Sequence, residues 1–138
     1  MREGLRGIAG IELTQQKPGV EVSYVYFPVL FPSESFNANI MQIVQAYRAE
    51  GVIVHPIALD EMCHTQPIFA DPALLEAAGV AYGLRGHDDV PAYGAGTQPV
   101  AEKIAGELLV LPMHPDLSEQ DVDDIVAATK KIAEAYRR

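Results

Sequence analysis

The stretch "LLVLPMHPDLSEQDVDDIVAATKKIAEAYRR" (residues 108–138) decides the fold, because it joins an apolar strand to a long amphipathic helix. Ser118 and Asp121 have the spacing of an N-terminal capping box, and acidic residues fill the first turn, which suits the helix dipole. The apolar positions recur at helical spacing and form one stripe: Val122, Ile125, Val126, Ile132, Ala133 and Tyr136. The pattern predicts a strand at 107–111 and a helix over 118–136.

A strand pattern also lies near the N-terminus. "VEVSYVYFPVLF" (residues 20–31) alternates with a period of two and is rich in β-branched and aromatic residues. One face carries Val25, Phe27, Val29 and Phe31, and the other carries Tyr24 and Tyr26. We predict a strand at 22–31, with an edge or a bulge at Pro28, because proline has no N–H to donate to a ladder.

A helix and a short strand follow. The apolar spacing predicts a helix over 35–50, capped by Ser33 or Ser35 and ended by Gly51. "VIVHPI" then reads as a buried strand at 51–56, closed by Pro56.

The rest of the chain is less regular. Residues 58–98 lack periodicity except at "DPALLEAAG", where Asp71 and Pro72 predict the start of a short helix. A helix resumes at "PVAEKIAGE" (residues 99–107). Within the irregular stretch we expect His64 at an exposed rim and Ile68 or Phe69 packed on the core.

This element order predicts an α/β (α+β) two-layer sandwich: a small mixed or antiparallel sheet of about three strands with helices packed on one face. The first two strands should run parallel, because a right-handed crossover through a helix joins them, and the third should lie antiparallel between them. The tyrosine face would remain open, so we expect it to be covered by a domain that this sequence does not contain or by a second copy in a two-fold dimer.

Composition narrows the function classes. A length of 138 residues is most simply one domain, 1–138, and 49% hydrophobic with 21% charged residues is a globular composition. The net charge of -9 argues against nucleic acid and against an anionic membrane surface. A single cysteine, no signal peptide and no apolar run long enough to span a bilayer predict a soluble cytoplasmic protein.

The segment "MCHTQPIF" (residues 62–69) concentrates groups that build catalytic and metal sites. Three interpretations compete: a nucleophile, a metal site, or a loop that binds a ligand whose chemistry takes place elsewhere. Cys63 as a nucleophile would need a base and an orienting group, and no acyl-transfer signature surrounds it. A small buried apolar role for this cysteine is the simpler interpretation.

A metal site is not favoured either. His55, Cys63, His64 and His87 are suitable ligand types, but their spacing matches no zinc motif. His114 is better explained as a turn residue, and the adjacent Asp88 and Asp89 as part of a solvated loop. The glycine-rich stretch that follows residue 82 contains neither G-x-G-x-x-G nor G-x-x-x-x-G-K, the two common phosphate-binding patterns. Because none of these candidates forms a complete site, we predict no catalytic residues and no metal.

Three blocks together resemble the DegT/DnrJ/StrS-type sugar aminotransferases, which are fold-type-I enzymes dependent on pyridoxal phosphate. "GVIVHP…CHTQPIF" is similar to a substrate-loop signature of that family, with His64, Gln66, Pro67 and Phe69 at the matching positions. "LRGIAGIELTQQKPGVEVSYVYFPVLF" resembles the entry into its small C-terminal domain, and "QPVAEKIAGELLVLPMHPDLSEQDVDDIV" its C-terminal run. The "LPMHPDLSEQDVDDIV" part is the most specific.

The resemblance covers only the C-terminal third of such enzymes. It implies that His64, Gln66 and His55 bind a sugar-nucleotide or cyclitol substrate, while the large domain holds pyridoxal phosphate. None of Lys17, Lys103, Lys130 and Lys131 lies in a Schiff-base context, so we expect no cofactor on this chain alone and no activity without a large-domain partner. The alternative is a stand-alone ligand-binding or assembly module that kept the fold and lost the reaction.

Overall fold

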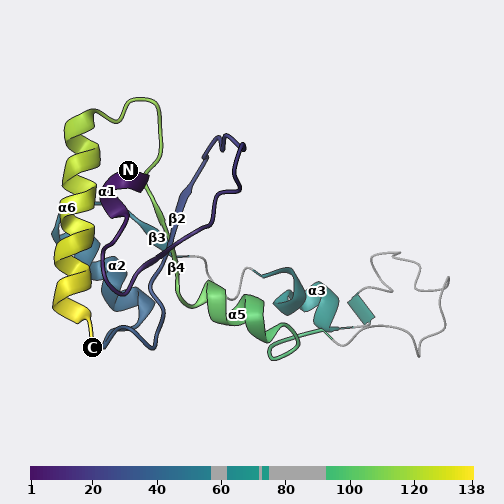
Figure 1. The fold of residues 1–138 in the computed structure, drawn as a ribbon. Coiled ribbons are helices and arrows are strands. Elements are labelled where there is room, and N and C mark those ends of the chain that lie inside the picture. The colour runs from purple at the N-terminus through teal and green to yellow at the C-terminus, as the bar shows by residue number, and fades with distance from the viewer. Residues whose placement is uncertain (57–61, 72, 75–92) are drawn as a thin grey trace. The chain divides into compact units, whose positions relative to one another are not determined.

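The computed structural model describes residues 1–56, 62–71, 73–74 and 93–138 (Figure 1). These residues belong to two compact units. The sheet unit comprises Met1–Ile57 and Gly106–Arg138, and the His64 unit comprises Ala58–Ala105.

The sheet unit contains a four-stranded antiparallel sheet in the order β1-β2-β4-β3. Its strands are β1 (Glu12–Leu13), β2 (Phe27–Leu30), β3 (His55–Pro56) and β4 (Leu108–Leu111). Because β2 and β3 both pair antiparallel with β4, they run parallel to each other on either side of it. This confirms the predicted direction of the three strands and the central place of the last one.

Two details of the first predicted strand are wrong. The ladder begins only at Phe27, which pairs with Leu111, and Val25 is 74% exposed instead of facing the core. The reason is that Pro112 follows Leu111 and offers no N–H, so the residues before Phe27 have no ladder to join. The edge strand β1 was not predicted, because two residues are too few to show a period.

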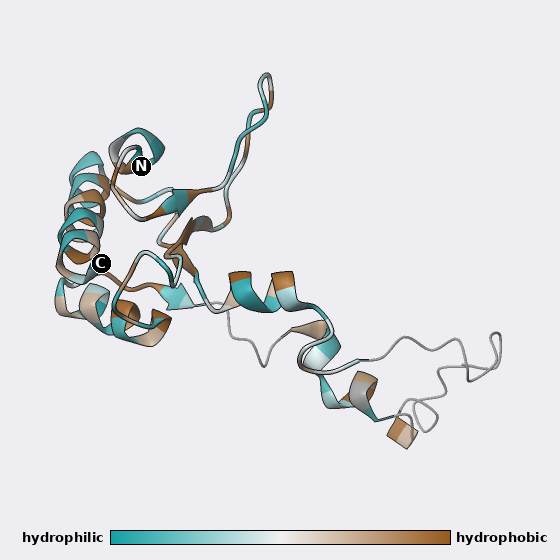
Figure 2. Cartoon of the chain, turned by 60° about the horizontal axis from the view of Figure 1, so that its bottom comes forward, coloured by the Kyte–Doolittle hydropathy of each residue, from teal (hydrophilic) through white to brown (hydrophobic). Residues whose placement is uncertain are grey.

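Three helices cover one face of this sheet, and two of them, α2 and α6, were predicted there (Figure 1). They are α1 (Arg2–Leu5), α2 (Ile40–Ala49) and α6 (Glu119–Tyr136), and α6 contacts both others. The predicted capping box of α6 is confirmed, since the Ser118 hydroxyl accepts from the Asp121 N–H and the Asp121 carboxylate accepts from the Ser118 N–H. Polar and apolar segments alternate along these helices in Figure 2.

The predicted start of α2 is wrong. Asn39 caps the helix and forms a capping box with Gln42, whereas Ser33 is occupied elsewhere. The Ser33 N–H and hydroxyl both donate to the Glu107 carboxylate, at 2.9 and 2.7 Å. Phe36 then forms an isolated bridge with Arg137, so the chain is tied to the end of α6 before the helix begins.

The core lies between the sheet and these helices. It combines alternate strand residues with the apolar helix stripes, and its fully buried members include Val29, Val44, Tyr47, Val54, Leu109 and Leu111. On the opposite face of β2 and β4, Pro28, Leu30, Leu108 and Val110 are only half-buried. We call these four half-buried residues, together with Tyr26 and Ile53, the open face.

One buried hydrogen bond inside this core gives a testable prediction. Tyr47 Oη donates to Thr129 Oγ1 at 2.8 Å, and Thr129 in turn donates to the Ile125 carbonyl. Burial raises the pKa of the Tyr47 phenol, so it stays neutral. Thr129→Val should lower the free energy of unfolding by about 1–3 kcal/mol, because it leaves the buried Tyr47 hydroxyl without its hydrogen-bond acceptor. Tyr47→Phe should cost less, and the double variant should cost less than the sum in a denaturation cycle. Strict additivity would contradict the coupling.

Short helical segments make up much of the described part of the His64 unit. They include η2 (Cys63–Thr65), α3 (Pro67–Ala70) and α5 (Pro99–Ala105). The predicted helix after residue 98 is confirmed up to Ala105, and the Asp71 carboxylate accepts from the Ala73 N–H as expected of a cap. The rest of the predicted segment after Asp71 lies largely outside the described residues. None of the described helices is both long and apolar enough to cross a membrane.

Candidate functional site

The candidate site is built around His64, which lies in the single turn of η2. His64 Nε2 is 2.9 Å from Glu102 Oε1 on α5, and the His64 carbonyl accepts from the Gly94 N–H at 2.7 Å. The side chain is therefore held by α5, and the backbone by the segment just before it. The His64 side chain is only 11% exposed, so the expectation that it lies at an exposed rim is wrong.

Glu102 organises this site. Its two carboxylate oxygens accept from the Gly96 N–H at 2.9 Å each, and Oε1 also accepts from the Gln98 N–H at 3.1 Å. Gly96 has a φ of 88°, a left-handed conformation that suits glycine and aims its N–H at the carboxylate. The Gly96 and Gln98 amides, followed by the His64 ring, lower the pKa of Glu102 because they stabilise its charged form.

Sequence reasoning missed Glu102. The available signal was an acid in the first turn of a helix that begins at a proline, behind two glycines. The glycine-rich segment lacks the phosphate-binding patterns, so its sequence gives no sign of an anion-binding role. In the structure its last part instead donates backbone N–H groups to a carboxylate of the same chain.

The lowered pKa of Glu102 predicts a pH dependence. A carboxylate whose pKa is lower in the folded state than in the unfolded state stabilises the fold. The stabilisation is complete at pH values above the unfolded pKa of about 4.3, and it is lost as the pH falls through the folded pKa. We expect the Gly96 and Gln98 amide resonances to titrate together in NMR spectra with a midpoint below the ordinary glutamate range. In Glu102→Gln this transition should vanish. A midpoint at or above the ordinary value would contradict the hydrogen-bonded arrangement.

The other residues of "MCHTQPIF" lie close by. Gln66 is half-buried at the start of α3, and its N–H donates to the Cys63 carbonyl. The Phe69 ring packs on Tyr93 within the same unit, with 5.5 Å between ring centroids, while Ile68 is largely exposed. Cys63 is exposed, so its predicted buried role is wrong, because the η2 turn directs it to solvent while anchoring His64.

His55, the third predicted ligand residue, belongs to the sheet unit. It is exposed on β3 and lines a cavity of about 570 Å³ together with His114. The remaining lining is apolar and acidic: Val25, Tyr26, Glu50, Gly51, Val52, Ile53, Val110, Leu111, Pro112, Met113, Leu117, Asp121, Asp124 and Ile125.

Two acidic residues that line this cavity, Asp121 and Glu50, accept hydrogen bonds from neighbouring residues. The Ser118 hydroxyl, followed by the Ser118 N–H, lowers the pKa of Asp121, and His114 adds a smaller electrostatic contribution. Glu50 accepts from Lys131 Nζ at 2.8 Å. The His114 carbonyl accepts from the Leu117 N–H, so the residue lies in a turn, while a ring hydrogen bond that fixes this turn stays a prediction.

The described residues contain no cluster of three or more histidine, cysteine or carboxylate groups suited to a metal ion. His64 is paired with Glu102, and His55 and His64 belong to different units. His87, Asp88 and Asp89 lie outside the described residues.

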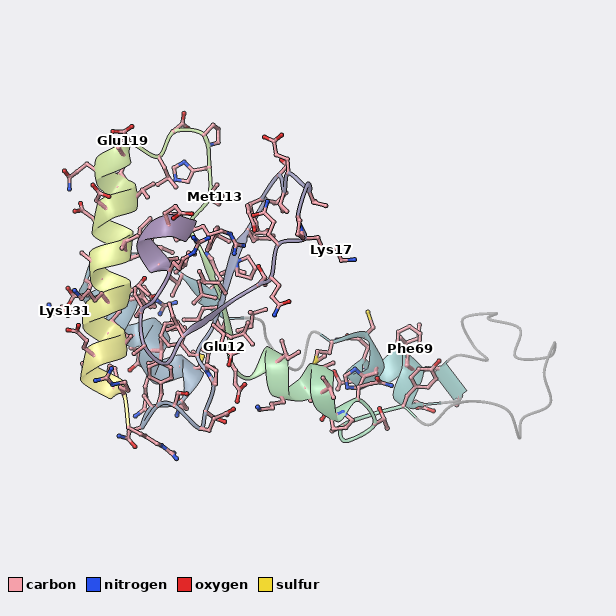
Figure 3. The ribbon with its side chains drawn as sticks, viewed as in Figure 1. Glu12, Lys17, Phe69, Met113, Glu119 and Lys131 are labelled. Atoms are coloured by element: carbon pink, nitrogen blue, oxygen red, sulfur yellow. The ribbon has the colours of Figure 1, made fainter. Side chains whose placement is uncertain are left out.

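All four lysines lie in the described residues and are exposed: Lys17, Lys103, Lys130 and Lys131. Figure 3 shows Lys17 on the connection between β1 and β2 and Lys131 on the outer side of α6. None of them lies on a strand of the sheet.

Comparison with known proteins places the chain in a family. The model of the DegT/DnrJ/EryC1/StrS aminotransferase family matches residues 1–130, and the chain belongs to this family. A search of curated proteins found no match.

Solved structures share the fold. One is DesV from S. venezuelae in complex with a ketimine intermediate, at 23% identity and a TM-score of 0.62, with 96% of this chain and 29% of that one covered. A DegT DnrJ EryC1 StrS aminotransferase from Brucella abortus has 19% identity and a TM-score of 0.64, with 96% and 28% covered. Sugar aminotransferase CalS13 from Micromonospora echinospora has 14% identity and a TM-score of 0.59, with 94% and 27% covered. The chain therefore spans less than a third of the length of these enzymes.

The family depends on pyridoxal phosphate, which forms a Schiff base with a lysine in a shielded site. The described residues do not fit this group, because every lysine of the chain is exposed on a connection or a helix surface. We therefore derive no catalytic step on this chain alone.

Proposed function

We propose that this chain acts as the small domain of a sugar aminotransferase and contributes His64 and Gln66 to the substrate pocket. The catalytic lysine and the cofactor site would come from a large domain, as a separate chain or as the rest of a longer protein. The observation that carries this proposal is the hydrogen-bonded pair of His64 and Glu102. The chain belongs to the aminotransferase family but spans less than a third of the length of the related enzyme structures.

The chemistry of the cluster suits a polyhydroxylated ligand. An imidazole ring and a primary amide together offer both donors and acceptors, which a sugar or cyclitol hydroxyl can use. The Phe69 and Tyr93 rings, packed beside this loop, supply apolar surface of the kind that lines small-molecule sites.

The open face of the sheet supports the need for a partner. Tyr26 and Ile53 are 65% and 67% exposed, and they continue the half-buried row on β2 and β4. Contiguous apolar surface of this kind is characteristic of an interface. A large-domain chain is the partner we propose, and a two-fold homodimer is the alternative that light scattering would reveal.

Binding of a nucleotide sugar tests the proposal. We expect no heat of binding when UDP-glucose is titrated into the chain alone, and saturable binding once a family large domain is added. His64→Ala should weaken that binding by about tenfold or more, since a lost hydrogen bond in a desolvated pocket costs about 1–3 kcal/mol. Cys63→Ser is the matched control, because the neighbouring side chain is exposed and should leave affinity unchanged. Equal affinity in wild type and His64→Ala would reject the assigned role.

A second function, a stand-alone binding module, is favoured by one observation. All described residues that line the 570 Å³ cavity with His55 belong to the sheet unit, so this unit forms the cavity by itself. This hypothesis predicts saturable binding to the chain alone that is lost in His55→Ala and retained in His64→Ala.

A further inference from the structure

The contacts of the Glu102 carboxylate determine where the His64 ring carries its proton. Glu102 accepts from two backbone N–H groups, and these keep it ionised. An ionised carboxylate has no proton to donate. The short contact between His64 Nε2 and Glu102 Oε1 is therefore a hydrogen bond only if Nε2 carries the hydrogen.

The other ring nitrogen, Nδ1, is not used in this pair. His64 Nδ1 has no hydrogen-bond partner within the described part of the chain. Among those residues, Arg2 Nε is the only side-chain N or O atom that is buried without a partner. Among the described residues, His64 Nδ1 is therefore not a buried atom without a partner, although most of the ring is covered.

We propose that Glu102 is a positioning residue that holds His64 as the Nε2–H tautomer, so that Nδ1 presents a lone pair to the ligand. With Nε2–H committed to Glu102, a neutral His64 can only accept at Nδ1. The ligand group that it recognises is then a donor, a hydroxyl or an N–H. The identity of that group as a sugar or cyclitol hydroxyl rests on the proposed function, whereas the tautomer does not.

The backbone supports this arrangement independently of the side chain. The Gly94 N–H holds the His64 carbonyl, and the Gly96 N–H holds Glu102, so one short turn fixes both members of the pair. The Thr97 hydroxyl closes the same turn by donating to the Gly94 carbonyl at 2.7 Å. Such an outer hydrogen bond orients an imidazole in the same way that carboxylates orient histidine ligands elsewhere.

Long-range ¹H–¹⁵N NMR spectra of the ¹⁵N-labelled full chain test the inference without any ligand. At about pH 9, where an imidazole is neutral, we expect the Nε2–H form of His64 to exceed the Nδ1–H form by about tenfold or more. Glu102→Ala should lower this ratio at least about threefold, because the charge-assisted bond is gone. Cys63→Ser is the matched control: its side chain is exposed, so the change leaves Glu102 and the turn that holds it in place and should leave the ratio unchanged.

A predominant Nδ1–H form in wild type would overturn the inference, as would an unchanged ratio in a folded Glu102→Ala. If Glu102→Ala does not fold, the wild-type ratio alone decides. Failure of UDP-glucose to bind once a family large domain is added would count against the proposed function and leave the tautomer result intact. An Nδ1–H ring would reject this inference even if the sugar bound.

Discussion

Leu109→Ala is expected to lower the free energy of unfolding of the sheet unit by about 2–5 kcal/mol, the range for a buried leucine that leaves a cavity. Leu109 is fully buried in the central strand β4, between Val29 of β2 and Pro56 of β3. Its loss removes contacts to both neighbouring strands at once. Most small domains have only about 5–15 kcal/mol of total stability, so the variant should unfold well below the wild-type midpoint.

Leu108→Ala is the matched control, because it makes the same change one residue earlier in the same strand. Leu108 points to the open face and is only half-buried. We expect it to cost less than half as much in urea denaturation at low protein concentration. Equal costs for the two variants would mean that the open face is covered as well as the core face.

The second large effect concerns activity. The chain alone should show no transamination above a protein-free blank, because none of its four lysines is placed to bind the cofactor. Addition of a family large domain should raise the rate by several orders of magnitude, since enzymes accelerate reactions by about a million-fold or more. A coupled assay for the keto-acid product would measure both states. Turnover by the isolated chain would contradict the proposed division of labour.

Much of the fold was predictable because strong local signals agree with the tertiary arrangement. The capping box at Ser118 and the long stripe of α6 fix the last helix, and the crossover rule fixes the direction of β2 and β3. The predicted start of α2 was wrong because Ser33 and Ser35 are also good capping residues and come earlier in the chain than Asn39, the actual cap. Its hydrogen bonds to Glu107, 74 residues away, cannot be read from local sequence.

The candidate site was predictable only in part. The family motif pointed to His64 and Gln66, but the partner of the ring lies 38 residues further along, on α5. No spacing rule connects a histidine in a short turn with an acid in a distant helix. The same resemblance grouped His55 with His64, and the structure assigns His55 to the sheet unit. The roles in substrate binding, the cytoplasmic location and the single-domain organisation stay predictions.

The central claim is that this aminotransferase-family chain supplies ligand-binding groups while its cofactor lysine lies elsewhere. The most direct measurement is to add pyridoxal phosphate to the pure chain, reduce with borohydride and determine the intact mass and the modified peptides. We predict only low, unsaturated labelling spread over the exposed lysines. A single adduct at one lysine, formed with one-to-one stoichiometry, would contradict the claim.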